Sequence, residues 1–323
     1  MKTLIEPIPR EELLRELTPE RKIRDTKKAS NEIYIFEAGD CPALMREVGR
    51  LREEAFRAAG GGTGEEVDID AEDLHPEGYS QLIVWDPVAQ EVVGGYRFIV
   101  CCNSHPECLS TEHYFRFSDR FRRRFLPHTI ELGRSFVQLQ YQARRNPKSL
   151  YALDNLWDGL GALVVLNPKV RYLFGKVTMY PTYNREARAI LFHFLEHYFA
   201  DREELMQGIQ TLPPYEGVLP EDLFTAESYE ENHRQLVLHL RERGESIPPL
   251  INLYMNLSPT MRLFDTVINP DFGHVEETGI LVTLKDIYPE KRERYTRWDG
   301  WRRNLSARRE AFACRKKSKE GSK

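Results

Sequence analysis

A carboxylate and a guanidinium lie three residues apart in the stretch HTIELGRS, residues 128–135, as Glu131 and Arg134. Apolar residues alternate with them, which is typical of a β-strand. An exposed ion pair on such a strand would contribute only about 0–1 kcal/mol to stability. The same two groups at a reaction centre would bind a charged substrate or accept a proton. The elements around this stretch decide between the two interpretations.

Two upstream segments carry residues that are unusual for their setting. Arg97 lies in the otherwise apolar stretch GGYRFIV, and a buried guanidinium needs an anionic partner. We expect an acid of the loop 68–73 to supply it. Arg52 and Phe56 are spaced i, i+4, on one face of a predicted helix. Phe56 fits the core, whereas Arg52 fits equally a snorkelling neighbour or a substrate contact.

The elements that position these residues alternate between strands and helices. Period-two patterns predict strands, and apolar residues at helical spacing predict helices. The predicted strands are 31–38, 80–86, 91–100, 128–141, 171–180 and 279–287, and the predicted helices are 41–56, 152–168 and 184–199. The second and third strands form a predicted hairpin around Pro87.

The composition is that of a soluble globular protein, since 41% of the 323 residues are hydrophobic and 30% are charged. No run reaches the roughly 18–20 apolar residues of a membrane span, and charges interrupt the N-terminus where a signal peptide would be apolar. We therefore expect a cytoplasmic protein. Five irregularly spaced cysteines do not form a disulfide framework or zinc-site pattern, so no metal site is predicted.

The charge is uneven along the chain. Residues 301–323 carry a net charge of +7, which leaves −11 for the rest of the protein. A second basic cluster, residues 116–125, interleaves arginines with phenylalanines. Such patches are either solvated faces or contacts for nucleic acid, an anionic membrane or an acidic carrier protein. The acidic body argues against nucleic acid.

The chain resembles the GNAT acyltransferase superfamily. Within it, the chain looks like the branch of ornithine-lipid and glycine-lipid N-acyltransferases, often labelled hemolysin-like, which are related to the acyl-homoserine-lactone synthases. The resemblance covers about residues 30 to 290, and it rests on Arg52, Phe56, the acidic stretch 68–73, Arg97, Glu131, Arg134 and the segments 172–184 and 268–284.

The resemblance implies an α/β (α+β) fold in which helices flank a mixed, mostly antiparallel central sheet, with a helical insertion and a C-terminal extension. The predicted organisation is a helical lead-in (1–30), an acyltransferase core (31–200), a helical insertion (201–250), the C-terminal part of the acyltransferase domain (251–292) and a basic tail (293–323).

The resemblance also implies direct attack of an amine on a thioester, without an acyl-enzyme. Glu131 would bind the ammonium and help to remove its proton, with Arg134 beside it. A backbone N–H near Phe136 or Val137 would polarise the thioester carbonyl. Tyr180 or Tyr183 would protonate the thiolate. The implied substrate-binding residues are Arg52, Phe56, Asp70, Asp73, Arg97, Phe136 and Val137.

The expected acyl donor is the phosphopantetheine thioester of an acyl carrier protein, with acyl-CoA as the alternative and no permanently bound cofactor. The stretch QLQYQARRNPKSLYAL lacks the glycine-rich turn that cradles the CoA pyrophosphate in acetyl-CoA enzymes of this superfamily. Carrier proteins present an acidic surface, which suits a basic patch. The predicted docking residues are Arg122, Arg123, Arg124, Arg144 and Arg145.

The resemblance therefore implies an N-acyltransferase that moves a long, 3-hydroxylated fatty acyl group to the α-amine of ornithine or glycine. The product would be a lyso-aminolipid, and the basic tail would contact an anionic membrane surface. The alternatives are a signal synthase of the acyl-homoserine-lactone kind and a non-catalytic, membrane-active lipid-binding protein.

Overall fold

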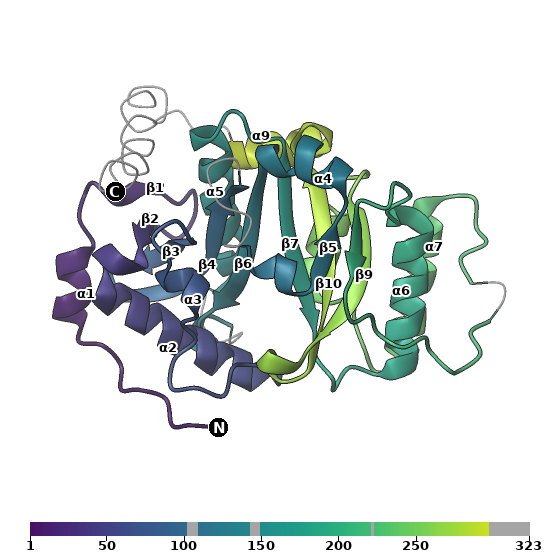
Figure 1. Ribbon diagram of the computed structural model, residues 1–323, viewed down its shortest axis with the longest axis horizontal. Helices are drawn as coiled ribbons and strands as arrows, with labels where there is room; N and C mark the ends of the chain where they lie inside the picture. The colour runs from purple at the N-terminus through teal and green to yellow at the C-terminus, as the bar shows by residue number, and fades with distance from the viewer. Residues whose placement is uncertain (102–108, 143–148, 221–222, 297–323) are drawn as a thin grey trace.

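An eight-stranded sheet forms the centre of the protein in the computed structural model, which describes residues 1–101, 109–142, 149–220 and 223–296 (Figure 1). All neighbouring strands are antiparallel except β6 and β7, which are parallel. In sheet order the strands are β1 (Lys22–Asp25), β2 (Glu32–Glu37), β3 (Ser80–Asp86), β4 (Glu91–Val100), β6 (Thr129–Val137), β7 (Tyr172–Met179), β10 (Val275–Thr283) and β9 (Arg262–Asn269). The predicted fold class is confirmed.

Helices cover both faces of this sheet. One face packs against α1 (Arg10–Glu16) and α2 (Pro42–Ala59), at the left of Figure 1. The same face carries α3 (Ala71–Leu74), α4 (Asp119–Arg124) and a two-stranded sheet of β5 (Phe115–Phe117) and β8 (Met206–Gly208). The other face packs against α5 (Ser149–Leu166), α6 (Arg185–Phe199), α7 (Tyr229–Glu242) and α8 (Pro249–Met255).

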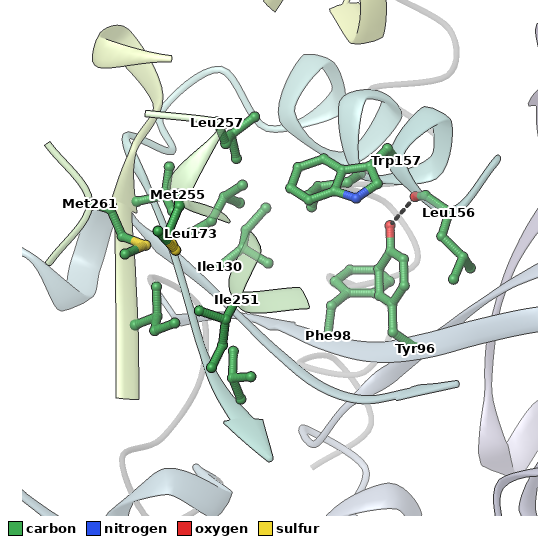
Figure 2. Close-up of a cluster of buried hydrophobic side chains, with 14 of the residues drawn as sticks. Tyr96, Phe98, Ile130, Leu156, Trp157, Leu173, Ile251, Met255, Leu257 and Met261 are labelled. Atoms are coloured by element: carbon green, nitrogen blue, oxygen red, sulfur yellow. Dashed lines mark hydrogen bonds between the residues drawn. The ribbon is translucent and has the colours of Figure 1, made fainter. Parts of the chain in front are cut away.

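The α5 face holds the largest hydrophobic core, part of which Figure 2 shows. Trp157 of α5 lies above Tyr96 and Phe98 of β4, and the Tyr96 hydroxyl donates to the Leu156 carbonyl at 3.4 Å. Ile251 of α8 closes this core beside β7. Apolar packing against α5 and α8 thus holds the central strands in place on this face of the sheet.

The helix that was predicted over 41–56 is α2, and its ends follow from local chemistry. Pro42 occupies the first turn, where its missing N–H costs nothing. Gly60 ends the helix in the left-handed region with φ +97°. The predicted hairpin is also confirmed, because β3 and β4 pair antiparallel from Ser80 to Asp86.

The strand predictions were wrong at both edges of the sheet. β1 lies inside the predicted helical lead-in, and β9 was not predicted. β10 begins at Val275 rather than at 279. Its first four residues, VEET, lie before the predicted start of the strand. The two glutamates are buried because Arg188 neutralises Glu276 and Lys176 neutralises Glu277.

The remaining predicted segments are only partly regular. Residues 201–250 hold β8 and α7, and Leu236 and Leu240 of α7 are buried in the α5-face core. α9 (Pro289–Thr296) packs on α5, where the Tyr295 ring centroid lies 5.5 Å from that of Trp157. The predicted basic tail beyond residue 296 lies outside the described residues. None of the described helices combines the length and apolar composition of a membrane-crossing segment.

Candidate active site

The site is created by two parallel strands that separate. β6 and β7 pair only from Thr129 and Tyr172 to Leu132 and Gly175. Beyond these residues both strands continue, and a cavity of 1440 Å³ opens between them. We call it the splay cavity; it is lined by residues 132–137 of β6, residues 176–179 of β7 and side chains from both faces of the sheet.

A β-bulge in β6 shapes the wall of the splay cavity. Tyr96 of β4 faces two residues of β6, Arg134 and Ser135, because Arg97 pairs with Gly133 and Gly95 with Phe136. Arg134 takes φ +51°, which is rare for a residue with a side chain and is typical of bulges at functional sites. The bulge bends β6 away from β7 and turns the Arg134 side chain toward the α2 face.

The bulge also leaves a backbone donor at the cavity. Gln138 donates its N–H to the Val93 carbonyl of β4 at 2.9 Å. Strand N–H groups alternate between the two neighbours, so the Val137 N–H points to the opposite edge, toward the separated β7. Of the two predicted oxyanion donors, the Val137 N–H therefore points toward the gap between β6 and β7, while the Phe136 N–H faces β4.

The predicted arginines and acids meet in one buried network. Arg97 contacts Asp70 at 2.6 Å and Asp73 at 3.2 Å, as expected from the sequence. Arg134 contacts Asp70 at 3.4 Å and Asp68 at 3.3 Å. Arg52 is fully buried, lies 3.2 Å from Asp73 and also donates to the side chain of Gln81. Three guanidiniums thus face three carboxylates.

A helix cap fixes the two acids that bind Arg97. Asp70 is the N-cap of α3, and its side chain accepts the Asp73 N–H at 2.9 Å. Burial acts to raise the pKa of Asp70, but the Arg97 and Arg134 guanidiniums outweigh it and hold that pKa well below its usual range. Burial raises the pKa of Asp68, which the charge of Arg134 only partly offsets.

Glu131 lies behind the wall of the splay cavity, with 1% of its surface exposed. Its carboxylate accepts hydrogen bonds from Tyr79 at 2.5 Å, Thr111 at 2.8 Å and Ser110 at 3.3 Å. Burial raises the pKa of Glu131, and the bonds from Tyr79 and Thr111 offset only part of this effect. Ser110 does line the cavity, so its hydroxyl connects the cavity to Glu131.

The splay cavity has two chemically different halves. Charged and polar side chains lie beside the aromatic rings of Phe56, Phe136 and Phe272 on the α2 face, and aliphatic side chains line the α5 face. The charged and polar group includes Asp70, Arg97, Tyr114, Arg134, Lys176 and Glu277, and the aliphatic group includes Leu132, Val137, Val177, Met179 and Leu250. A polar substrate on one side would meet an apolar chain at the gap between β6 and β7.

The predicted tyrosines and Phe56 line the cavity from different sides. Tyr183 packs with the α5-face core and donates its hydroxyl to the Ser246 carbonyl at 3.0 Å, while Tyr180 packs with the α2-face core. Burial raises the pKa of both hydroxyls. The Phe56 ring lies 5.0 Å from that of Phe272, over which Arg134 stacks.

The predicted docking arginines do not line the splay cavity. Arg122 and Arg123 of α4 pair with Glu112 at 2.7 Å and Asp119 at 2.6 Å, and Arg124 is exposed. Phe121 and Phe125, which flank these arginines, are buried, so the arginines form the outer face of α4. Arg144 and Arg145 lie outside the described residues.

Several residues around the site were not predicted. Tyr79, Ser110 and Thr111 surround Glu131, and Lys176 and Glu277 form an ion pair of 2.7 Å in the wall of the cavity. The available sequence signal for Lys176 and Glu277 was a charged residue within an otherwise strand-like stretch, YLFGKVTM for the first and VEETGILVT for the second. In the described ranges, no three His, Cys, Asp or Glu side chains are grouped so as to hold a metal ion.

Known proteins have similar sequences, and part of the chain matches a known domain family. Residues 51–152 match the acetyltransferase (GNAT) domain family. A glycine N(alpha)-acyltransferase of Phocaeicola vulgatus is 48% identical over 302 residues, which are 91% of this chain and 93% of that protein. A glycine N(alpha)-acyltransferase of Bacteroides thetaiotaomicron is 49% identical over 308 residues, with 91% and 90% covered. The crystal structure of the AHL synthase LasI is similar over 45% of this chain and 71% of that chain, with 16% identity and a TM-score of 0.30.

Proposed function

Since this chain belongs to the GNAT acyltransferases and is an enzyme that acylates an amino acid at nitrogen, we propose that its acceptor is glycine and its product an N-acylglycine lipid. Both relatives are named for glycine, and the match spans nearly the whole of each protein. The acyl group in this proposal is long and 3-hydroxylated, as the resemblance implies.

The single observation that supports a long acyl chain is the division of the splay cavity. Its α5-face half is lined by leucine, valine and methionine side chains, which would stabilise a bound chain by about 0.8 kcal/mol for each buried CH₂. Its α2-face half is charged, which suits an amino acid. The thioester would lie between them, at the gap between β6 and β7.

The reaction in this proposal is direct attack of the glycine amine on the thioester carbonyl. The amine is a nucleophile only after it loses a proton, which would pass through the Ser110 hydroxyl to Glu131. The Val137 N–H would stabilise the oxyanion. The C–S bond then breaks, the nitrogen loses its second proton to solvent, and the departing thiolate takes a proton from the Tyr180 or Tyr183 hydroxyl, which solvent restores.

The test is an assay of the purified enzyme with glycine, ornithine and homoserine lactone, each with a 3-hydroxypalmitoyl carrier protein. Mass spectrometry of the products should show the amide of glycine. An amide of ornithine alone would show that the acceptor is ornithine rather than glycine. An acyl-homoserine lactone would favour the signal-synthase alternative. Absence of any amide, together with membrane lysis by the protein, would favour the non-catalytic alternative.

We propose acyl carrier protein as the donor because α4 presents an arginine-rich outer face. Replacing Arg122, Arg123 and Arg124 with alanine should raise the apparent KM for the acyl carrier protein about 10-fold at low salt and flatten its salt dependence. The KM for the same acyl chain on coenzyme A should not change. Steady-state kinetics at two ionic strengths measure both.

The matched control removes three exposed arginines elsewhere, Arg10, Arg15 and Arg46 of α1 and α2. It should leave both donors unaffected. Equal kinetics for the α4 variant and the control would contradict docking on α4.

The basic tail is proposed to contact anionic membranes, which cosedimentation of the full chain with phosphatidylglycerol vesicles measures.

A further inference from the structure

Lys176 and Glu277 form an ion pair in the wall of the splay cavity that the proposed mechanism does not use. Lys176 lies on β7 just beyond its last pair with β6, and Glu277 lies on the neighbouring strand β10. The Lys176 ammonium lies 2.7 Å from Oε2 of Glu277, and the two side chains are 13% and 7% exposed. Both are therefore largely desolvated, and both border the space where an acceptor must lie.

Two further side chains hold this pair rigidly. The Lys176 ammonium lies 4.0 Å from the centroid of the Tyr114 ring. The Tyr114 hydroxyl donates to Oδ1 of Asn269 at 3.0 Å, and the Asn269 amide donates to Oε2 of Glu277 at 3.2 Å. The four side chains form a closed ring of contacts. Such a ring fixes the charges before a ligand arrives.

The pair still has hydrogen-bonding capacity toward the cavity. Both polar contacts of Glu277 fall on Oε2, and within the described residues Oε1 has no recorded partner. An ammonium has three N–H donors. Among the described residues, the Lys176 ammonium pairs with one carboxylate, that of Glu277. One acceptor and at least one donor therefore remain, side by side and of opposite charge.

The other guanidiniums that line the cavity are matched by carboxylates, and of the lining acids without a cation beside them in the described residues, Asp271 is exposed and Glu245 accepts the Asn184 N–H at 2.8 Å. Arg97 and Arg134 are shared among Asp68, Asp70 and Asp73. The remaining acid–base pair, His113 with Glu72, is bound at 2.9 Å and has an exposed histidine. Among the described cavity residues, Lys176 and Glu277 are thus the buried pair best placed to bind a small dipolar ligand.

We propose that Lys176 and Glu277 bind the acceptor as a zwitterion, with the substrate carboxylate on the Lys176 ammonium and the substrate ammonium on Oε1 of Glu277. This inference rests on the proposed function and identifies the residues that recognise the α-amino carboxylate. An amine without the carboxylate loses the contact with Lys176. Recognition by this pair therefore selects α-amino acids over simple amines.

The experiment compares glycine with glycinamide, which keeps the amine and lacks the carboxylate, using a 3-hydroxypalmitoyl carrier protein as donor. The wild type should prefer glycine. Lys176→Met should raise the KM for glycine roughly 10- to 100-fold, the effect of one charged hydrogen bond, and leave the KM for glycinamide unchanged. Lys176→Arg should restore the preference. Glu277→Gln should raise the KM for both amines.

The control is Glu276→Gln, because Glu276 precedes Glu277 on β10 but is bound to Arg188 and does not line the cavity. It should change neither KM for the amines. Thermal unfolding and the KM for the 3-hydroxypalmitoyl carrier protein verify that each variant is folded. Lys176→Gln replaces Lys176→Met if the latter is unfolded. A Lys176 variant that keeps the glycine preference would overturn the inference, whereas a wild type that acylates no glycine would overturn the proposed function itself.

Discussion

Replacing Arg97 with methionine should lower the free energy of unfolding by about 3–5 kcal/mol. Arg97 is 3% exposed and is held between Asp70 and Asp73, with its guanidinium 4.4 Å above the Tyr79 ring. Methionine fills the space of the side chain but leaves two carboxylates without this counter-charge. The loss is large because the two acids are fixed by the α3 cap and cannot turn to solvent.

The pH dependence of this loss follows from Asp70. The pKa of Asp70 is well below its usual range because Arg97 and Arg134 outweigh the effect of burial. A lowered pKa contributes stability above about pH 4, the unfolded value, and this stability is lost as the pH falls through the folded value. Without Arg97 the pKa of Asp70 rises toward its usual range, so the deficit of the variant should be largest near pH 7 and smaller near pH 3.

Urea unfolding at the two pH values measures the effect. The control is Arg123→Met, which removes an i, i+4 pair with Asp119 whose side chains are 76% and 83% exposed. That change should stay within about 0.5 kcal/mol at both pH values. An Arg97→Met deficit that does not change with pH would refute the role assigned to the Asp70 charge.

The pairing of Arg97 was predictable from the sequence for a physical reason. A guanidinium in an apolar strand has to be neutralised, and the loop 68–73 supplies the nearest cluster of acids in the sequence. The central strands were predictable too, because β3 and β4 are apolar on both faces and end at turn residues. Local pattern and burial agree there.

The partners of Glu131 and Glu277 were not predictable in this way. Tyr79 and Lys176 are 52 and 101 residues from the carboxylates that they bind, and nothing in the local sequence sets those distances. Strand β10 was predicted four residues too far along the chain, at 279–287, and the glutamates in its first part look unfavourable for a buried strand until Arg188 and Lys176 are placed beside them. Charge pairs between distant strands depend on sheet order, which the sequence pattern does not contain.

Replacing Glu131 with glutamine should reduce kcat by roughly 10² or more if Glu131 accepts the amine proton through Ser110. Glutamine has the same shape, and its carbonyl oxygen keeps an acceptor for Tyr79 while its NH2 can donate to the Thr111 hydroxyl, so the fold and the KM for the acyl donor should change little. The difference between the two side chains is the capacity to take up a proton.

The pH profile separates this role from a structural one. Burial raises the pKa of Glu131, so kcat/KM of the wild type should fall on the acid side at a higher pH than an ordinary carboxyl would give. Glu131→Gln should lose that limb as well as the rate. Thr111→Val is the matched control, because it removes one hydrogen bond to Glu131 from a residue that does not line the cavity. Loss of this bond destabilises the ionised form of Glu131 relative to its protonated form, so the pKa of Glu131 rises further. The acid limb of the pH profile should therefore move to still higher pH while turnover is kept. A Glu131→Gln enzyme with normal turnover would instead assign the proton to a group inside the splay cavity.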